Sequence, residues 1–283
     1  MRKKIFIVGG TSSIGNSLRN FFSKNYNVVY SCRVKEKRKF YYIDLAESLN
    51  NVKISENFDY IFFCAGISSM KLCKENPTFA YKINVENTFN LIERFVELGS
   101  KIIFFSTNLV FNGLNPFPDE KCNPSPLCEY GRLKFETEKK IIGLSNNVSI
   151  VRLSKVIDRN MQLFDRWKNQ FLLNEKVKAF INYKISPISM NYLSNAMGQL
   201  LRNWTPGILH LSSHDEISYF EVAKFIAKKN GFKEDLVDPQ TVECSDLFMD
   251  SIPYYVSLDM RYTAKMLNIN IPSFHEALSF YNR

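Results

Sequence analysis

The sequence predicts an α/β fold, a Rossmann-type doubly wound parallel sheet joined to a small C-terminal lid domain. Strand-like apolar runs alternate with helical stretches from residue 1 to about 157. The runs at residues 60–66 and 101–107 are apolar almost throughout, as in parallel strands that helices cover on both faces. A glycine-rich turn separates the first strand from the first helix. With 283 residues and 45% hydrophobic content, the chain can bury a core of this size.

The first strand, turn and helix have the order that a dinucleotide site requires. Gly9 permits a tight turn, Gly15 lets the helix approach the strand, and the start of the helix attracts a pyrophosphate. Serines replace the middle glycine of the pattern, and a serine hydroxyl is able to donate to a phosphate instead. An ordinary strand–turn–helix without a nucleotide fits the same residues. We expect a bound dinucleotide to contact Gly9, Ser12, Ser13, Ile14 and Gly15.

The second strand, residues 27–32, ends without the acidic residue that often binds the adenosine ribose. Arg33 follows it, and the basic residues between 35 and 39 are interpreted as a solvated loop. A cation at position 33 favours a 2′-phosphate, so we expect NADPH as the cofactor, with NADH as the alternative. Residues 40–45 are expected to form the next strand, in which Asp44 accepts a bond from the adenine amino group and Leu45 is a further cofactor contact.

Two later strands end in residues that suit a ligand crevice. Ala65 and Gly66 are small enough for a cofactor to cross the end of their strand. The next strand ends in the hydroxyls of Ser106 and Thr107. The carboxyl ends of parallel strands face the crevice where ligands bind, so both sets of residues are candidates for a site.

Tyr130 and Lys134 are four residues apart, so on a helix their side chains share one face. A nearby lysine favours the phenolate and is expected to lower the pKa of Tyr130 toward neutrality. Such a tyrosine suits proton donation to a carbonyl oxygen while hydride arrives at the carbon. The same spacing also fits a solvated helical face. Another helix is expected at residues 77–98, and Asn84 lies within it.

The alternation of strand and helix changes after residue 157. We therefore expect two domains, residues 1–157 with the cofactor and catalytic residues and residues 158–283 as the lid, with a strand near 208–212 that returns to the sheet. The lid region has helical stretches at residues 161–173, 191–202 and 221–229.

Taken together, these motifs resemble the extended short-chain dehydrogenases/reductases, and within them the dTDP-4-dehydrorhamnose reductase family of nucleotide-sugar reductases. Order and spacing agree over essentially the whole chain. The resemblance rests on residues 9–15, 44–45, 83–85, 106–113, 130–134, 151–156, 186–190, 207–213 and 217–221.

The resemblance implies an NADPH-dependent reduction of a 4-keto-6-deoxy sugar carried on a nucleoside diphosphate, in surface polysaccharide biosynthesis. Tyr130 would protonate the keto oxygen, and Thr107 would hydrogen-bond the same oxygen. Lys134 would lower the tyrosine pKa and hold the nicotinamide ribose. Asn84 would support the geometry behind the lysine, among the cofactor-binding residues.

Three positions depart from the family pattern. Asn108 and Leu109 stand where an acidic residue and an aromatic residue are common, and Lys155 stands where an aromatic residue that packs on the sugar is expected. We expect Thr107, Asn108 and Lys155 to bind substrate. A lysine at the mouth of the site suggests a different sugar or a nearby anionic group, whereas a solvent-facing Lys155 would carry no such meaning.

Two other functions fit the same scaffold. One is a nucleotide-sugar epimerase or dehydratase, although Asn108 stands where a dehydratase would benefit from an acid. The other is a non-catalytic NADP-binding regulatory protein, which the altered glycine motif suggests. Retention of Thr107, Tyr130 and Lys134 argues against that second alternative, because a binding module needs no aligned proton donor.

Composition narrows the partners and the compartment. The net charge of +9 suits an anionic nucleotide sugar and its cofactor, and no motif indicates nucleic acid or membrane binding. Six cysteines without a Cys-x-x-Cys pair, and no signal peptide, predict a cytoplasmic protein. The three histidines show no metal-binding spacing. A homodimer is compatible with the helices around residues 79–98 and 130–142.

Overall fold

The computed structural model describes residues 2–34, 41–52, 54, 56–158, 161–242 and 253–279. The predicted basic loop at residues 35–39, together with Phe40 and Cys244, lies outside the described residues. Within the described part of the chain, no helix is long and apolar enough to cross a membrane.

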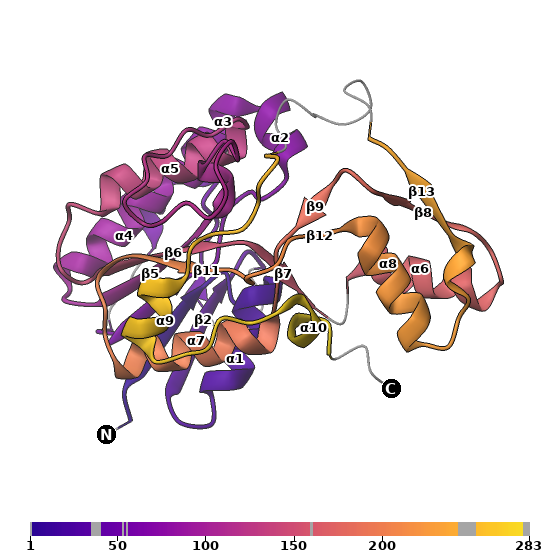
Figure 1. Ribbon diagram of the computed structural model, residues 1–283. Helices are drawn as coiled ribbons and strands as arrows, with labels where there is room; N and C mark the ends of the chain where they lie inside the picture. Colours follow the sequence, from indigo (N-terminus) through magenta and orange to yellow (C-terminus); the bar gives the residue numbers. More distant parts are fainter. Residues whose placement is uncertain are drawn as a thin grey trace.

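A parallel sheet of seven strands forms the centre of the fold, which confirms the predicted Rossmann-type class (Figure 1). Its order is β11-β6-β5-β4-β1-β2-β3. The order reverses between β1 and β4, and a ligand crevice is expected outside the carboxyl ends of the strands at such a point. The strands are β1 (Lys4–Val8), β2 (Asn27–Cys32), β3 (Tyr41–Tyr42), β4 (Tyr60–Phe63), β5 (Lys101–Thr107), β6 (Val148–Leu153) and β11 (Gly207–Leu211).

Strand β3 is much shorter than the expected strand at 40–45. The chain leaves the sheet because Asp44 forms a turn, in which its carboxylate accepts a hydrogen bond from the Ala46 amide at 2.9 Å. The Asp44 carbonyl accepts a second bond from the Glu47 amide. An aspartate that bonds its own backbone two residues on is a common way to start a turn.

Side chains alternate between the two faces of the sheet, and each face has its own core. On β1, Ile5 and Ile7 belong to one core and Phe6 and Val8 to the other. The first core is covered by α1 (Ser13–Phe22) and α7 (Met190–Arg202). The second is covered by α4 (Thr88–Glu97) and α5 (Glu129–Ile141). Helices therefore cover both faces of the sheet and exclude water from them, as its apolar strands require.

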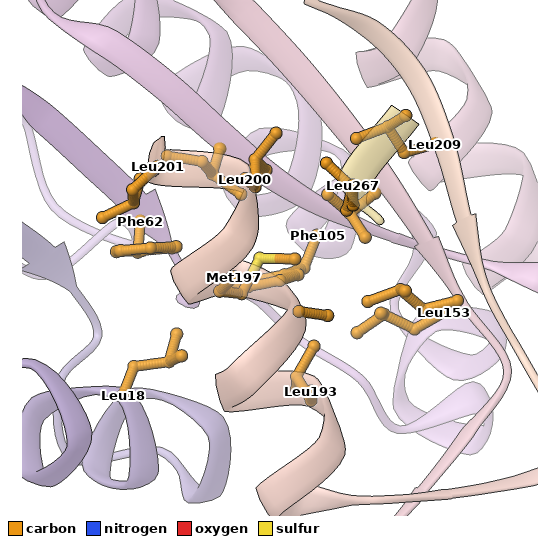
Figure 2. Packing of buried hydrophobic residues seen from close by; sticks show 14 of the residues in the cluster. Leu18, Phe62, Phe105, Leu153, Leu193, Met197, Leu200, Leu201, Leu209 and Leu267 are labelled. Carbon is orange, nitrogen blue, oxygen red and sulfur yellow. The ribbon is translucent and has the colours of Figure 1, made fainter. Parts of the chain in front are cut away.

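Helix α7 packs directly on the sheet although it follows the expected domain boundary at 157. Figure 2 shows Leu193, Met197 and Leu200 of this helix among residues of the first core, with Phe105 and Leu153 beside them. Strand β11 pairs with β6 in parallel along its whole length. Helix α9 (Arg261–Leu267) also reaches this core through Leu267. The sheet domain is therefore built from both halves of the chain.

The lid has a separate core formed by residues from several short elements. Helices α6 (Gln162–Leu172) and α8 (Tyr219–Lys229) pack here, beside the parallel pair β8 (Val177–Phe180) and β13 (Val237–Gln240). The remaining lid and linker elements are β7 (Lys155–Ile157), β9 (Lys184–Ile185), β10 (Pro187–Ser189), β12 (Ile217–Ser218), η4 (Glu234–Leu236) and α10 (Phe274–Ala277).

The expected helix at 77–98 consists of three segments in the structure, α3 (Pro77–Tyr81), a π-helical turn η2 (Lys82–Asn87) and α4. Single π-helical turns inside longer helices are rare and often lie at functional sites. The other short helices are η1 (Leu49–Asn51), α2 (Met70–Glu75) and η3 (Asn108–Val110).

Candidate active site

A cavity of about 500 Å³ lies at the carboxyl ends of β4, β5 and β6, with lid residues on its other side. It brings together most of the site residues that the sequence predicts. These are Ser12, Ser13, Ile14, Ala65, Gly66, Thr107, Asn108, Tyr130, Lys134 and Lys155. The cavity does not include Gly9, Gly15, Arg33, Asp44, Leu45 or Asn84 among its lining residues.

A larger cavity of about 960 Å³ lies between α1, α7 and the C-terminal segment. Ser13 is the one predicted site residue that borders it, and Tyr130 and Lys134 are absent from its lining. The smaller cavity is therefore the candidate active site, because the groups suited to chemistry converge there.

The start of α1 forms one wall of the candidate site. Gly9 has a φ of 81°, and a Cβ there would lie 2.8 Å from the Ala65 amide nitrogen. A Cβ on Gly15 would overlap the Gly9 carbonyl. Both glycines are therefore required by the close contact of turn, strand and helix, which is the role that the sequence predicts for them.

Ser12 is the N-cap of α1. Its hydroxyl accepts a hydrogen bond from the Gly15 amide at 3.1 Å and donates one to the Gly9 carbonyl at 2.8 Å. The Ser12 hydroxyl proton, which was expected to reach a phosphate, is thus donated to a carbonyl within the turn. The amides of Ser13 and Ile14 have no acceptor among the described residues, and they point from the positive end of the helix.

These features fit a dinucleotide. Two free amides at a helix start can bind a pyrophosphate. Arg33 is exposed just after β2, beside the strand that carries the glycine turn. Leu45 differs from the expectation, since its side chain is buried in the second core.

Thr107 and Asn108 lie where β5 ends. The Thr107 hydroxyl accepts a bond from the Leu109 amide at 3.2 Å and reaches the Asn108 side-chain oxygen at 3.4 Å. The Asn108 amide group donates to the Val256 carbonyl at 2.7 Å. Asn108 therefore ties the catalytic strand end to residues 253–259, a segment called the strap below.

The strap closes one side of the cavity through Pro253 and Val256. The Glu216 carboxylate accepts bonds from the amides of Val256 and Ser257 at 2.7 and 2.9 Å, and from the Ser257 hydroxyl at 2.8 Å. These charge-assisted bonds fix the strap against the lid.

Helix α5 carries Tyr130 and Lys134 into the cavity. Cys128 caps the helix, because its sulfur accepts a bond from the Gly131 amide at 3.3 Å. A Cβ on Gly131 would overlap the Leu109 carbonyl, so this glycine lets α5 touch the turn that follows Thr107. Lys134 donates to the Phe105 carbonyl at 2.8 Å. The ammonium thus faces the end of β5, and Tyr130, one turn earlier on α5, lines the same cavity.

The pKa of Tyr130 differs from the prediction. Burial raises the pKa of its phenol, and Lys134 does not offset this effect. The expected lowering of the Tyr130 pKa is therefore wrong for this structure, in which the ammonium bonds a backbone carbonyl. Burial also lowers the pKa of Lys134 to about 8. Both shifts have one cause, since a desolvated group favours its neutral form.

Asn84 lies in the π-helical turn η2 and is 4% exposed. Its side chain accepts a bond from the Ile67 amide at 2.7 Å and donates to the Ile67 carbonyl at 2.8 Å. Its own carbonyl accepts a bond from the Thr137 hydroxyl on α5 at 2.8 Å. Asn84 therefore joins the loop after Gly66 to the catalytic helix, instead of lining the cavity.

Lys155 lines the cavity with an exposed side chain, and its role toward a sugar stays a prediction. Strand β7 begins at this residue and pairs with β10, so the chain has already turned from the sheet toward the lid. The walls of the cleft lower the pKa of its ammonium by desolvation.

Sequence reasoning missed several residues of the site. Ser154 lines the cavity, and its buried hydroxyl and that of Ser106 have no hydrogen-bond partner among the described residues. Tyr183 and Lys184 enter from the loop and short strand before β10. The signal for Ser154 was its place at the end of an apolar strand, whereas nothing in the sequence marks the two lid residues.

Comparisons with known proteins agree with this arrangement. The family model described as RmlD substrate binding domain matches residues 2–282. Methionine adenosyltransferase 2 subunit beta of Bos taurus is 23% identical over 80% of this chain and 71% of its own length. The dTDP-4-dehydrorhamnose reductase of Sinorhizobium fredii is 28% identical over 59% of this chain and 60% of its own length.

Solved structures share the whole fold. A dTDP-4-dehydrorhamnose reductase from Bacillus anthracis in complex with NADP superposes with a TM-score of 0.83 at 21% identity, over 99% of this chain and 98% of that one. MoeE5 in complex with UDP-glucuronic acid and NAD has a TM-score of 0.82 at 19% identity, over 98% and 96%. At these identities the likeness establishes the fold, and the family model extends over nearly every residue. The chain belongs to the RmlD substrate binding domain family.

Proposed function

We propose that this protein is an NADPH-dependent reductase of the 4-keto group of a nucleotide sugar. The observation that carries the proposal is the shared cavity, in which Thr107, Tyr130 and Lys134 lie beside the open start of α1. The cavity can therefore hold a hydride donor and a keto group next to one proton donor, the Tyr130 phenol. The similarity to a dTDP-4-dehydrorhamnose reductase, and to a structure with NADP bound, supports the same reaction.

Each catalytic residue has one task in this reaction. NADPH, when bound, supplies the hydride that reduces the keto carbon. Tyr130 donates its phenolic proton to the oxygen that becomes the alcohol, and Thr107 donates a hydrogen bond to the same oxygen. A donor already in place stabilises the charge that develops on oxygen, and its removal typically lowers the rate on the order of 100-fold or more. Lys134 holds the nicotinamide ribose hydroxyls.

The cofactor is held by the start of α1. The Ser13 and Ile14 amides bind the pyrophosphate, and Arg33 binds the 2′-phosphate that distinguishes NADPH from NADH. Asp44 contributes at the adenine end, with one carboxylate oxygen already engaged by the Ala46 amide. NADH is the alternative cofactor. Equal binding of NADPH and NADH would show that Arg33 does not discriminate between the two cofactors.

The protonated phenol of Tyr130 and the amide at Asn108 both suit a reductase. A phenol that is protonated at neutral pH is ready to donate a proton. An epimerase must first take a proton from a sugar hydroxyl, for which a phenolate is needed. Asn108 supplies no carboxylate for a dehydratase, and its amide group is engaged by the strap.

The proposed reaction would serve the synthesis of a surface polysaccharide, as the family resemblance implies, and the cytoplasm stays the compartment expected from the sequence. It implies a 4-keto-6-deoxy sugar on a nucleoside diphosphate. Position 155 departs from the family pattern, and its consequence for the sugar is argued separately below. The homodimer expected from the sequence stays a prediction.

A second candidate is a non-catalytic regulatory subunit. The similarity to proteins named methionine adenosyltransferase 2 subunit beta favours it, because that name describes a subunit of a transferase. A subunit of that kind would bind a dinucleotide without reducing a sugar. The aligned Thr107, Tyr130 and Lys134 favour the reductase.

Titration of the purified protein with NADPH and with NADH, followed by NADPH oxidation against a panel of 4-keto nucleotide sugars, separates these functions. The reductase predicts NADPH binding and oxidation with one or more sugars. Binding of NADPH without oxidation on any sugar would support the regulatory subunit. NADP(H) that co-purifies and is never released would support the epimerase.

A further inference from the structure

The charged side chains that line the candidate site are all basic. Of the described residues that line the cavity, three are lysines, and none is an aspartate or a glutamate. Two departures from the family pattern contribute to this imbalance, since Asn108 replaces an acidic residue and Lys155 replaces an aromatic one. Both changes make the cavity more positive.

Lys134 and Lys184 each have a partner in the protein. Lys134 donates to the Phe105 carbonyl at 2.8 Å. Lys184 lies 4.0 Å from the Glu216 carboxylate and 5.0 Å from the centre of the Tyr254 ring. The side-chain ammonium of Lys155 forms no hydrogen bond, ion pair or ring contact with the part of the chain that the structure describes. It is the lysine whose charge is left for a ligand.

The position of Lys155 relates it to the sugar. Thr107 pairs with Leu153 in the sheet, so Lys155 follows two residues beyond the register partner of the catalytic threonine. Lys184, by contrast, comes from the lid strand β9 and contacts the strap residue Tyr254. A nucleotide sugar whose keto group reaches Thr107 and Tyr130 therefore places its sugar ring, ahead of its diphosphate, next to Lys155.

We propose that Lys155 binds a carboxylate carried by the sugar, so that the enzyme selects an acidic nucleotide sugar over a neutral one. The inference rests on the proposed function and replaces one detail of the family resemblance, the neutral 6-deoxy carbon. The Lys155 ammonium lines the cavity wall and has no counter-ion among the described residues, so an anionic group on a bound ligand would pair with it.

The test measures binding, so that it does not depend on turnover. Calorimetric titrations in the presence of NADP⁺ compare the affinity for UDP-glucuronate with that for UDP-glucose, and the affinity for dTDP-glucuronate with that for dTDP-glucose. Two pairs are used because the preferred nucleotide base is not known. UDP and dTDP alone report on the diphosphate. The variants are Lys155→Met and Lys155→Arg, and Lys178→Met is the matched control, since Lys178 is an exposed lysine on β8 outside the cavity.

The wild-type protein is expected to bind the glucuronate at least about 10-fold more tightly than the matching glucose nucleotide, the low end for a hydrogen bond to a charged group. Lys155→Met removes that preference, with less than about a 2-fold change for the glucose nucleotide, Lys155→Arg retains most of it, and Lys178→Met leaves it unchanged.

Three results would overturn the inference. The first is equal wild-type affinity for acidic and neutral sugars. The second is an equal loss for all ligands in Lys155→Met, which would assign Lys155 to the diphosphate and leave the proposed reductase intact. The third is no binding of either glucuronate. Failure of the proposed function itself would appear separately, either as no binding of NADPH before any sugar is added or as no NADPH oxidation with any 4-keto nucleotide sugar.

Discussion

Gly131 lies between Tyr130 and Lys134 and is the residue through which α5 touches the turn after Thr107. A side chain there would overlap the Leu109 carbonyl. The sequence shows this glycine only as an unremarkable helix position, where glycine normally destabilises. The structure explains it, because the phenol reaches the end of β5 only if the two backbones are in contact.

Gly131→Ala is therefore expected to destabilise the protein by about 1–3 kcal/mol and to lower kcat, because α5 must move away from the turn. Helix propensity alone predicts a gain of about 1 kcal/mol, so the sign of the change is informative. Gly143→Ala is the control, since a Cβ there would meet no atom within 4 Å. Urea unfolding of both variants checks this, and a stabilised Gly131→Ala would contradict the close contact.

Lys134 gives the site a dependence on pH. Its pKa in the folded protein is about 8, against an ordinary value of 10.5, so between these values the unfolded chain binds more protons than the folded one. Stability then rises with pH over this window, and burial of the ammonium opposes folding below it.

Comparison with Lys134→Met isolates that dependence. From pH 7.5 to 9.5, the wild-type free energy of unfolding should rise relative to that of the variant by on the order of 2 kcal/mol, since each pKa unit is worth about 1.4 kcal/mol. Urea titrations at the two pH values measure the difference. A stability difference that stays constant would show that Lys134 is not desolvated in the folded protein.

At the scale of elements, the π-helical turn η2 is the feature that ties the cofactor loop to the catalytic helix. Asn84 bonds the Ile67 backbone through both ends of its amide, and Thr137 bonds the Asn84 carbonyl. The sequence predicted a helix over this region and placed Asn84 near the cofactor. It gave no sign of the π-helical turn, because the partner is backbone 17 residues away.

Asn84→Ala removes the partner of the half-buried Ile67 amide and leaves the Ile67 carbonyl with only the bond that the Cys73 thiol donates at 3.8 Å. We expect it to destabilise the protein by about 2–4 kcal/mol. NADPH binding should also weaken, because the segment at Ala65 and Gly66 loses its support. Asn90→Ala on the exposed side of α4 is the matched control and should change neither property. Unchanged NADPH affinity in a folded Asn84→Ala would separate this residue from the cofactor site.

The strap and the lid show where sequence reasoning stops. The apolar strands at 60–66 and 101–107 and the glycine turn were recognisable, since each pattern is local. Glu216 and Val256 are 40 residues apart, and their contact exists only after folding. The same holds for Lys184, on a strand of two residues. That Thr107, Tyr130 and Lys134 come together in one cavity was therefore predictable, whereas most of the lid residues that line the same cavity were not.

At the scale of the molecule, two bodies enclose one site. The sheet supplies the start of α1 and the ends of β4, β5 and β6, and the lid supplies Lys184 and the strap that it holds. The sheet domain was expected to end at 157 except for a strand near 208–212, and β11 is that strand, whereas the packing of α7 on the first core was not expected. The site therefore lies where the chain crosses between the two bodies at Lys155.

This arrangement makes Tyr130 the residue on which the whole account depends. The chain holds a phenol, with its pKa raised by burial, beside the place where a hydride donor fits. If the protein is a reductase, the phenol must supply the proton, and no other residue of the cavity is placed on the same helix face beside Lys134.

The most direct measurement is single-turnover oxidation of bound NADPH by the wild type and by Tyr130→Phe, with the NADPH affinity of each determined by fluorescence titration. We expect the variant to keep its NADPH affinity within about 2-fold. Its rate of hydride transfer should fall by on the order of 100-fold or more, since one donor to the developing oxyanion is gone. Turnover in Tyr130→Phe at the wild-type rate would contradict the account.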